Sequence, residues 1–212
     1  MENIVIIGAG GHGKEIAFLI KRLSQYNLVG FYDDSKIGQV VCNVPVISNI
    51  DQLELANSPV NAVLGIAEPK IKEQIIKRLS RNSNIRFPNL IDPKAELGIN
   101  IELGIGNVVM TNATFTADIK VGNFNMFNIG STVGHDVEIG SYNSIYPSVN
   151  LSGGTILSNK AELGVGTKVI QGITIGEGAI IGAGSVVINN IDKHEKVVGV
   201  PAKRIGEVKN ES

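Results

Sequence analysis

Residues 133–169, VGHDVEIGSYNSIYPSVNLSGGTILSNKAELGVGTKV, show a repeat of six residues, and this repeat extends from Ile91 to Asp192 without an insertion. The 102 residues of this region form 17 rows of six, and every row begins with Ile, Leu, Val or Phe. The fifth position is Ala, Ile, Asn, Val, Thr or Ser, and glycine dominates the second position. A period of six fits neither the 3.6 residues of an α-helical turn nor the alternation of a single strand.

The six-residue period is typical of hexapeptide-repeat β-helices, in which each row supplies one short strand and one corner. The side chain that leads each row points into a shared core, and glycine in the second position permits a tight corner. Three rows close one triangular coil of about 18 residues, and successive coils stack at about 4.8 Å, the spacing of strands in a sheet. The alternative is a β-sandwich with chance periodicity, and 17 uninterrupted rows argue against it.

The composition of the chain limits the functions and the cellular compartments that are expected for it. The chain has 212 residues, a formal net charge of −1 and one cysteine, Cys42. Without a surplus of basic residues we expect no binding to nucleic acid. A lone cysteine suits a reducing compartment. The first residues, MENIVIIGAGG, lack the basic region of a signal peptide, and no apolar run reaches the roughly 18 residues of a membrane span. We therefore expect a cytoplasmic protein with no membrane span.

The region before the repeat alternates strands and helices. Apolar runs predict strands at 3–7, 28–32, 60–66 and 85–90, with a short strand or turn at 40–47, and helical spacing predicts helices at 12–25, 50–56 and 68–82. Ser48 or Asn49 is expected to cap the second helix. This order predicts a small Rossmann-like α/β domain with a parallel sheet over residues 1–86. Residues 87–212 are predicted to form the all-β parallel β-helix, with a C-terminal cap from Asn189 onward over its open end.

A glycine loop joins the first strand to the first helix. Gly8, Gly10 and Gly13 match G-x-G-x-x-G, and Asp33 stands 20 residues further on, at the end of the second strand. In this context backbone N–H groups and a helix N-terminus can bind phosphate, and carboxylates can accept hydrogen bonds from a ribose or a base. About 85 residues supply only one mononucleotide-binding half, which favours a single nucleotide such as a nucleotide sugar. NAD binding and a structural turn without a ligand are the alternatives.

Two histidines are candidates for contacts with a substrate. His12 lies in the glycine loop, where it either contacts a diphosphate or sugar or faces solvent. His135 occupies the third position of its row, beside a corner, so its side chain should point away from the core. Asp136 follows it and could fix the tautomer of the imidazole and raise its basicity. One coil later lies Gly153, whose bare backbone would leave an accessible N–H and room for a substrate. A surface histidine without a function is the alternative.

At these residues the sequence resembles a known family. The hexads, the row Val133-Gly-His-Asp-Val-Glu and the segment Val198-Gly-Val-Pro-Ala-Lys203 resemble bacterial left-handed β-helix acyltransferases. The loop Gly8-Ala-Gly-Gly-His-Gly13 and Phe31-Tyr-Asp-Asp34 narrow the resemblance to one branch. That branch contains the nucleotide-amino-sugar N-acetyltransferases of the bacillosamine and perosamine pathways and the sialic acid O-acetyltransferases.

The resemblance implies a homotrimer with acetyl-CoA as co-substrate between adjacent β-helices. It implies a catalytic role for His135 and Asp136. It implies nucleotide-sugar contacts at Gly10, Gly11, His12, Asp33, Asp34 and Gly65, with Asn128 orienting the acceptor. It implies acetyl-CoA contacts at Gly153, Val165 and Ala183. Some members carry a second histidine near the thioester, nine residues after the catalytic one; here that position is Ser144, which is expected to line the acyl site.

The predicted function is therefore acetyl transfer to a nucleotide-linked amino sugar in bacterial surface-glycan biosynthesis. His135 would act as the general base for direct attack on acetyl-CoA. A cysteinyl-enzyme intermediate is not expected, because Cys42 belongs to the other domain. The histidines are scattered and no C-x-x-C motif exists, so no metal is expected. The alternatives are a sugar O-acetyltransferase of the sialic acid type and a non-catalytic trimeric scaffold that senses nucleotides.

Overall fold

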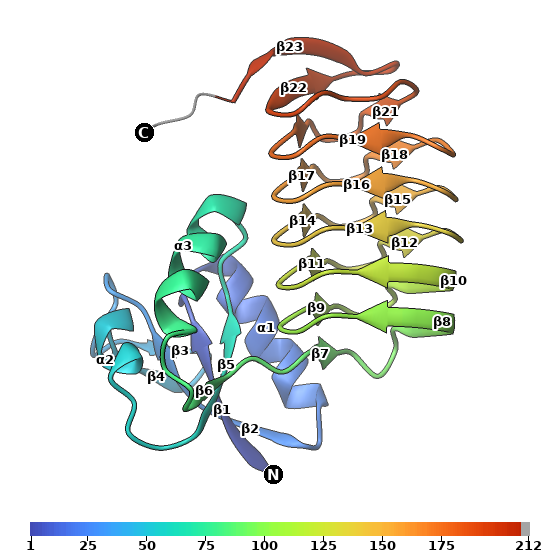
Figure 1. Ribbon diagram of the computed structural model, residues 1–212. Helices are drawn as coiled ribbons and strands as arrows, with labels where there is room; N and C mark the ends of the chain where they lie inside the picture. The colour runs from blue at the N-terminus through green and yellow to red at the C-terminus, as the bar shows by residue number, and fades with distance from the viewer. Residues whose placement is uncertain (209–212) are drawn as a thin grey trace. The chain divides into compact units, whose positions relative to one another are not determined.

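A computed structural model describes residues 1–208 of the 212 (Figure 1). The chain divides into two compact units, Met1–Pro93 and a second unit that begins at Lys94. The division therefore falls a few residues beyond the expected boundary after residue 86. The predicted architecture, a small α/β domain followed by a parallel β-helix with a C-terminal cap, is confirmed.

The first unit is built around a mostly parallel six-stranded sheet of order β3-β4-β2-β1-β5-β6. The central strand β1 pairs in parallel with β2 and β5, and its residues from Ile4 to Ile7 are buried. The elements are β1 (Glu2–Ile7), α1 (Gly11–Arg22), β2 (Tyr26–Tyr32), β3 (Val40–Val41), β4 (Val44–Ser48), α2 (Ile50–Glu54), β5 (Val60–Leu64), α3 (Pro69–Leu79), β6 (Ile85–Arg86) and β7 (Leu90–Ile91).

The helices of this unit follow the predicted pattern with shorter ends. Helix α1 buries Ile16, Leu19 and Ile20, the helically spaced residues, and ends at Arg22 because Leu23 leaves the helical conformation. Asn49 is the cap of α2, since its side-chain oxygen accepts a hydrogen bond from the N–H of Gln52 at 3.0 Å. An N-cap of this kind satisfies one of the free N–H groups at a helix start.

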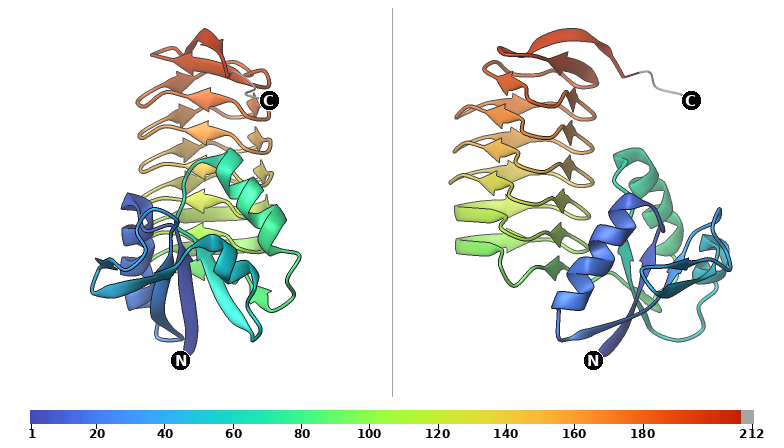
Figure 2. Two further views of the ribbon diagram at one scale, coloured as in Figure 1. Left: turned by 90° about the vertical axis from the view of Figure 1, so that its left-hand side faces the viewer. Right: turned by 180° about the vertical axis from the view of Figure 1, so that it is seen from behind.

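The second unit is a stack of coils with very short strands (Figure 2). Two-residue strands follow one another at intervals of six residues, except where β8 and β10 continue through a corner and at the end of the stack, where β22 and β23 are longer. The strands are β8 (Glu96–Leu103), β9 (Val108–Val109), β10 (Thr114–Val121), β11 (Met126–Phe127), β12 (Thr132–Val133), β13 (Glu138–Ile139), β14 (Ser144–Ile145), β15 (Asn150–Leu151), β16 (Ile156–Leu157), β17 (Glu162–Leu163), β18 (Lys168–Val169), β19 (Thr174–Ile175), β20 (Ile180–Ile181), β21 (Val186–Val187), β22 (Glu195–Val198) and β23 (Lys203–Glu207).

Strand pairing confirms that three rows make one coil. Strand β12 pairs in parallel with β15, which places Val133 opposite Leu151, 18 residues later. The residues that lead the rows are buried from Val109 to Val187, as expected for a shared axial core, whereas Leu97 in the first coil is 37% exposed. The end of the stack is covered as predicted, since β22 pairs with β20 and turns back into the antiparallel strand β23.

One corner of the β-helix is held by a ladder of three buried asparagines, Asn107, Asn125 and Asn143. The side-chain N–H₂ of Asn125 donates to Asn107 Oδ1 at 3.1 Å, and that of Asn143 donates to Asn125 Oδ1 at 3.0 Å. Asn125 also donates to the carbonyl of Gly140 at 2.9 Å. A buried amide is tolerated only when its donors and acceptors are satisfied, and stacking at 18-residue intervals satisfies them.

Replacing the central asparagine should destabilise the β-helix. We expect Asn125→Ala to lower the free energy of unfolding by about 3 kcal/mol, because the partners on Asn107, Asn143 and Gly140 are left buried without it. Urea denaturation measures the effect, and Asn189→Ala, at an exposed residue of the same unit, serves as the control. Equal unfolding free energies for Asn125→Ala and the control would contradict a stabilising ladder.

Candidate active site

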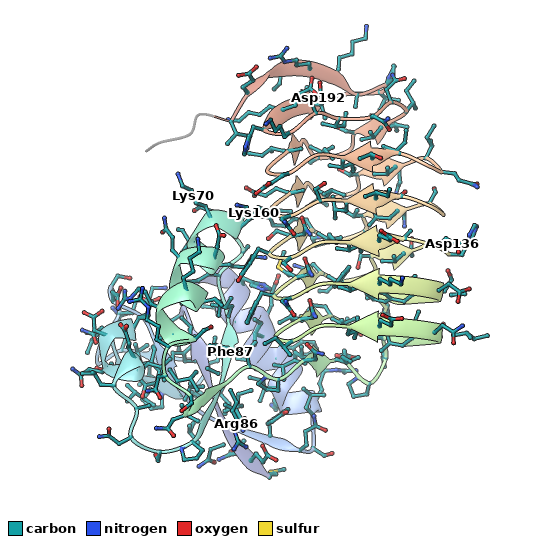
Figure 3. The ribbon with its side chains drawn as sticks, in the orientation of Figure 1. Lys70, Arg86, Phe87, Asp136, Lys160 and Asp192 are labelled. Carbon is teal, nitrogen blue, oxygen red and sulfur yellow. The ribbon has the colours of Figure 1, made fainter. Side chains whose placement is uncertain are left out.

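His135 and Asp136 stand at a corner of the β-helix, in the turn between β12 and β13. Their side chains are 57% and 67% exposed, so both point away from the core as predicted. Figure 3 shows Asp136 projecting from the edge of the stack. Asp136 has a positive φ of 57°, a conformation that aspartate tolerates better than most residues. Its N–H donates to the carbonyl of Ala117 at 3.1 Å, which fixes the corner to the preceding coil.

The two side chains form a short hydrogen bond. His135 Nδ1 lies 2.7 Å from Asp136 Oδ2. An ionised carboxylate can only accept, so Nδ1 carries the proton and donates it to this bond. In the neutral imidazole the other nitrogen, Nε2, is then unprotonated and available as a base. The pair therefore presents an oriented proton acceptor at the surface of the corner.

Gly153 forms the surface on which the imidazole rests. A Cβ atom placed on Gly153 would lie 2.5 Å from both Cε1 and Nε2 of His135 and 3.0 Å from Cδ2. The ring therefore packs against the α-carbon of Gly153, one coil away, as the 18-residue period predicted. The expected open N–H beside the histidine is not observed, because Gly153 is buried. The next residue, Gly154, donates its N–H to the carbonyl of His135 at 2.8 Å and holds the backbone in place.

The other residues expected near the acyl group are distributed around the β-helix. Asn128 is 4% exposed, and its Oδ1 accepts the N–H of Ile129 at 2.7 Å. Ser144, in β14, is fully buried. Val165 is 51% exposed and lies beneath Ala183, whose following residue Gly184 donates to the carbonyl of Val165 at 2.8 Å. Val165 and Ala183 lie at a different corner from His135, so one β-helix does not bring them to the catalytic pair.

In the glycine loop, Gly8 and Gly13 are closely packed, as is Gly65 after β5, whereas Gly10 and Gly11 are open. A Cβ on Gly13 would lie 2.2 Å from the carbonyl oxygen of Gly8, and one on Gly65 would lie 2.7 Å from the same atom. Gly8, Gly13 and Gly65 thus permit the strand ends and α1 to approach each other. A Cβ on Gly10 or Gly11 would meet no atom within 4 Å.

A cavity of about 360 Å³ lies at the carboxyl ends of the parallel strands of this unit, where open α/β sheets bind ligands. Its wall combines aliphatic residues with two carboxylates, an amide and a guanidinium. The lining residues are Gly8, Tyr32, Asp33, Asp34, Ser35, Ile50, Ile66, Ile71, Gln74, Ile75 and Arg78. The volume and the chemistry fit a base and ribose better than a whole dinucleotide.

The two carboxylates of this cavity are already bonded to the backbone around them. Asp33 Oδ2 accepts the N–H of Ala9 at 2.7 Å, and Asp33 Oδ1 accepts the N–H and the hydroxyl of Ser35 at 3.0 and 2.7 Å. Burial alone would raise the pKa of Asp33, but these hydrogen bonds and the charge of Lys36 lower the pKa below its ordinary value. Asp34 Oδ1 accepts the N–H of Ile50 at 2.9 Å and so holds the start of α2.

His12 lies in the first turn of α1. Its ring Nδ1 is 3.1 Å from Glu15 Oε2, and its side chain is 10% exposed. The first hydrogen bond of the helix runs from Lys14 N–H to the carbonyl of Gly10 at 3.1 Å. The preceding N–H groups, from Gly11 to Gly13, are those that an α-helix leaves unbonded and that bind anions at a helix start.

Sequence reasoning missed two basic residues beside this site. Lys36 Nζ donates to the carbonyl of Ala9 at 2.8 Å. Arg78 lines the cavity and forms ion pairs with Glu54 at 2.8 Å and Asp51 at 2.5 Å, which raise its pKa. The spacing of neither residue distinguishes it from an ordinary surface cation, so only the structure could identify them.

Residues 1–208 offer neither a preformed metal site nor a membrane-spanning helix. Within this range no group of three or more His, Cys, Asp or Glu residues is arranged to hold a metal ion. None of the helices described there combines the length and the apolar character that a membrane span requires.

Comparison with known proteins gives three similarities. Residues 3–79 match the family model of the PglD N-terminal domain. The structure is similar to the acetyltransferase domain of PglB from Neisseria gonorrhoeae, with a TM-score of 0.92 and 32% identity over 97% of this chain and 100% of that chain. It is also similar to PerB from Caulobacter crescentus, solved in complex with CoA and GDP-perosamine, with a TM-score of 0.87 and 29% identity over 97% and 98% of the two chains.

Curated sequences match over shorter regions. The chain is 44% identical over 153 residues to the 2,3,4,5-tetrahydropyridine-2,6-dicarboxylate N-acetyltransferase of Enterococcus faecalis, a match that covers 66% of each chain. The chain thus spans less than two thirds of the length of the first curated relatives that it matches.

Proposed function

Because the chain belongs to the family of β-helix sugar acetyltransferases with a PglD-type N-terminal domain, we propose that it transfers the acetyl group of acetyl-CoA to the amino group of a nucleotide-linked sugar. The observation that carries this proposal is the oriented pair His135–Asp136, whose ring is seated on Gly153. The same chain also contains a glycine loop and a cavity of a size that fits a nucleotide. PerB, a protein of similar structure, was solved with CoA and GDP-perosamine, a sugar nucleotide.

In the proposed reaction His135 is the general base. The amine nitrogen of the sugar attacks the thioester carbonyl carbon while Nε2 of His135 takes a proton from the amine. The tetrahedral intermediate then releases the CoA sulfur, and the proton on the imidazole returns to that sulfur. Asp136 holds the tautomer that this step requires. Attack is direct, because the cysteine of the described chain, Cys42, belongs to the first unit.

We assign the sugar nucleotide to the first unit and acetyl-CoA to the β-helix. Gly10, Gly11 and His12 would bind the diphosphate, and Asp33, Asp34 and Gly65 would form the nucleotide end of the site. Asn128 would orient the acceptor. Gly153, Val165 and Ala183 would contact acetyl-CoA, with Ser144 near the acyl group.

A homotrimer is part of the proposal. His135 stands on a convex, exposed corner, and Val165 and Ala183 lie at another corner of the same β-helix. A second copy of the chain would bring the two kinds of corner together and enclose the thioester, which closed threefold symmetry permits. Multi-angle light scattering at micromolar concentration tests this, and a monomeric mass would rule out a shared site.

The test of function is a screen for acetyl transfer. UDP-, GDP- and CMP-linked amino sugars are incubated with acetyl-CoA, and mass spectrometry measures the acetylated product and free CoA. A product whose amine carries the acetyl group supports the proposal, and one acetylated at a hydroxyl points to a sugar O-acetyltransferase. Nucleotide binding without any CoA release would favour a scaffold instead. We further propose that the reaction serves surface-glycan synthesis and takes place in the cytoplasm, where acetyl-CoA and sugar nucleotides are both supplied.

A further inference from the structure

We infer that Asp33 and Lys36 act on the sugar nucleotide through Ala9, as a brace that sets the direction of the phosphate-binding N–H groups. This inference rests on the proposed function, because it assigns a role within the nucleotide site. It departs from the expectation that the acidic residue at the end of β2 bonds the ribose or the base. Its basis is the set of hydrogen bonds that surround Ala9.

Ala9 is held from both sides. Its N–H donates to Asp33 Oδ2 at 2.7 Å, and its carbonyl accepts from Lys36 Nζ at 2.8 Å. Ala9 is fully buried and both bonds are partly buried, so competition from water is reduced. The brace is itself fixed, because Ser35 donates twice to the other oxygen of Asp33 and the N–H of Asp33 donates to the carbonyl of Ser48 at 3.0 Å.

The geometry of the peptide bond transmits this restraint to the loop. The carbonyl of Ala9 and the N–H of Gly10 belong to one planar trans peptide, so they point in opposite directions. Holding the carbonyl toward Lys36 therefore directs the N–H of Gly10 away from Lys36. Gly10 and Gly11 have no side chain, and a Cβ atom added to either would meet no neighbour within 4 Å, so packing does not restrain this segment. The carbonyl of Gly10 is held by the N–H of Lys14 at 3.1 Å, so the brace adds its restraint on the N–H side of Gly10, where glycine tolerates other values of φ.

The hydrogen bonds of the brace also account for the ionised state of the Asp33 carboxylate. Both oxygens of Asp33 already receive donors from the protein, which leaves few lone pairs for a ligand. A carboxylate that already accepts several hydrogen bonds from the protein is suited to holding a loop in place and poorly suited to recognising a sugar. The same bonds keep Asp33 ionised at neutral pH, since they lower its pKa. Lys36 balances the charge beside it, so the loop is fixed at little electrostatic cost.

The first test needs no nucleotide. Amide hydrogen exchange at Ala9 is followed by NMR in the wild type, in Asp33→Ala, in Lys36→Met and in Lys77→Met, an exposed lysine of the same unit. We expect exchange at Ala9 to accelerate by about tenfold or more in the Asp33 variant and less in the Lys36 variant, with Ile6 unchanged as the internal reference for folding. Unchanged exchange at Ala9 in Asp33→Ala would overturn the brace.

The second test separates a brace from a ribose contact. Calorimetry measures the affinities of UDP and GDP, their nucleosides and their 2′,3′-dideoxy forms for the same proteins. A brace should lower diphosphate affinity about tenfold in Asp33→Ala and nucleoside affinity less than twofold, and the loss should be equal for the dideoxy forms. If the loss disappears with the dideoxy forms, Asp33 bonds the ribose and the inference is wrong. If the wild type binds none of these probes, the proposed function fails, while the exchange experiment still decides the brace.

Discussion

Replacement of His135 by alanine should lower kcat by about 10²- to 10⁴-fold, the usual contribution of general base catalysis. An amine acceptor is mostly protonated near neutral pH and cannot attack until a proton leaves. Asp136 holds Nδ1, which leaves Nε2 as the ring nitrogen that can take the proton. Steady-state kinetics with acetyl-CoA and the sugar nucleotide found in the screen measure the loss.

The KM values for both substrates should change little in His135→Ala, because the imidazole acts on the transition state and contributes little to binding. Asp136→Asn is the matched variant, since an amide can still accept from Nδ1 but carries no charge, and it should cost less than His135→Ala. Ser144→Ala should cost least. A His135→Ala variant that keeps more than half of the wild-type kcat would show that the histidine is only a surface residue.

The coil register was predictable because burial recurs at a fixed interval. An apolar residue every six positions leaves one way to stack rows, so the alignment of His135 with Gly153 followed from counting and is confirmed. The same counting places Val165 at another corner, which is why a single β-helix cannot assemble the proposed acetyl-CoA site. Helix ends were less predictable, since Leu23 fits the apolar pattern of α1 and lies beyond its end.

Hydrogen bonds between distant segments were beyond the reach of the sequence, whereas local ones, His135 with Asp136 and the cap at Asn49, were anticipated. Asn107, Asn125 and Asn143 occupy the small-residue position, but their burial depends on a ladder that forms only when the coils stack. Asp33 is a candidate by its position in the sequence, whereas its bonds to Ala9 and Ser35 depend on how two loops meet. The repeat period predicts the direction in which a side chain points. It does not predict which polar atoms will form hydrogen bonds with that side chain.

The second large effect is expected at Gly153, where alanine should lower kcat by about 10²-fold. Gly153 does not have a positive φ, so the backbone accepts alanine without φ strain, and the three atoms nearest to the added methyl group all belong to the imidazole. Cε1 and Nε2 of His135 lie 2.5 Å from that methyl position, well inside van der Waals contact. The ring must therefore move outward by about 1 Å, and a displacement of that size can cost about 10²-fold in rate.

Steady-state kinetics distinguish two roles for Gly153: positioning the His135 ring and contacting acetyl-CoA. If Gly153 positions the ring, Gly153→Ala should lower kcat and leave the KM for acetyl-CoA within about twofold, whereas loss of a binding contact should raise that KM. Gly154→Ala is the neighbouring control: its methyl group would meet nothing closer than Gly172 Cα at 4.0 Å, but its φ of +65° costs stability. Assayed well below its melting temperature, that control should keep the wild-type kcat. If Gly153→Ala and the wild type have equal activity, catalysis does not depend on the position of the His135 imidazole against Gly153. The assignment of His135 as an oriented base would then lose its geometric support.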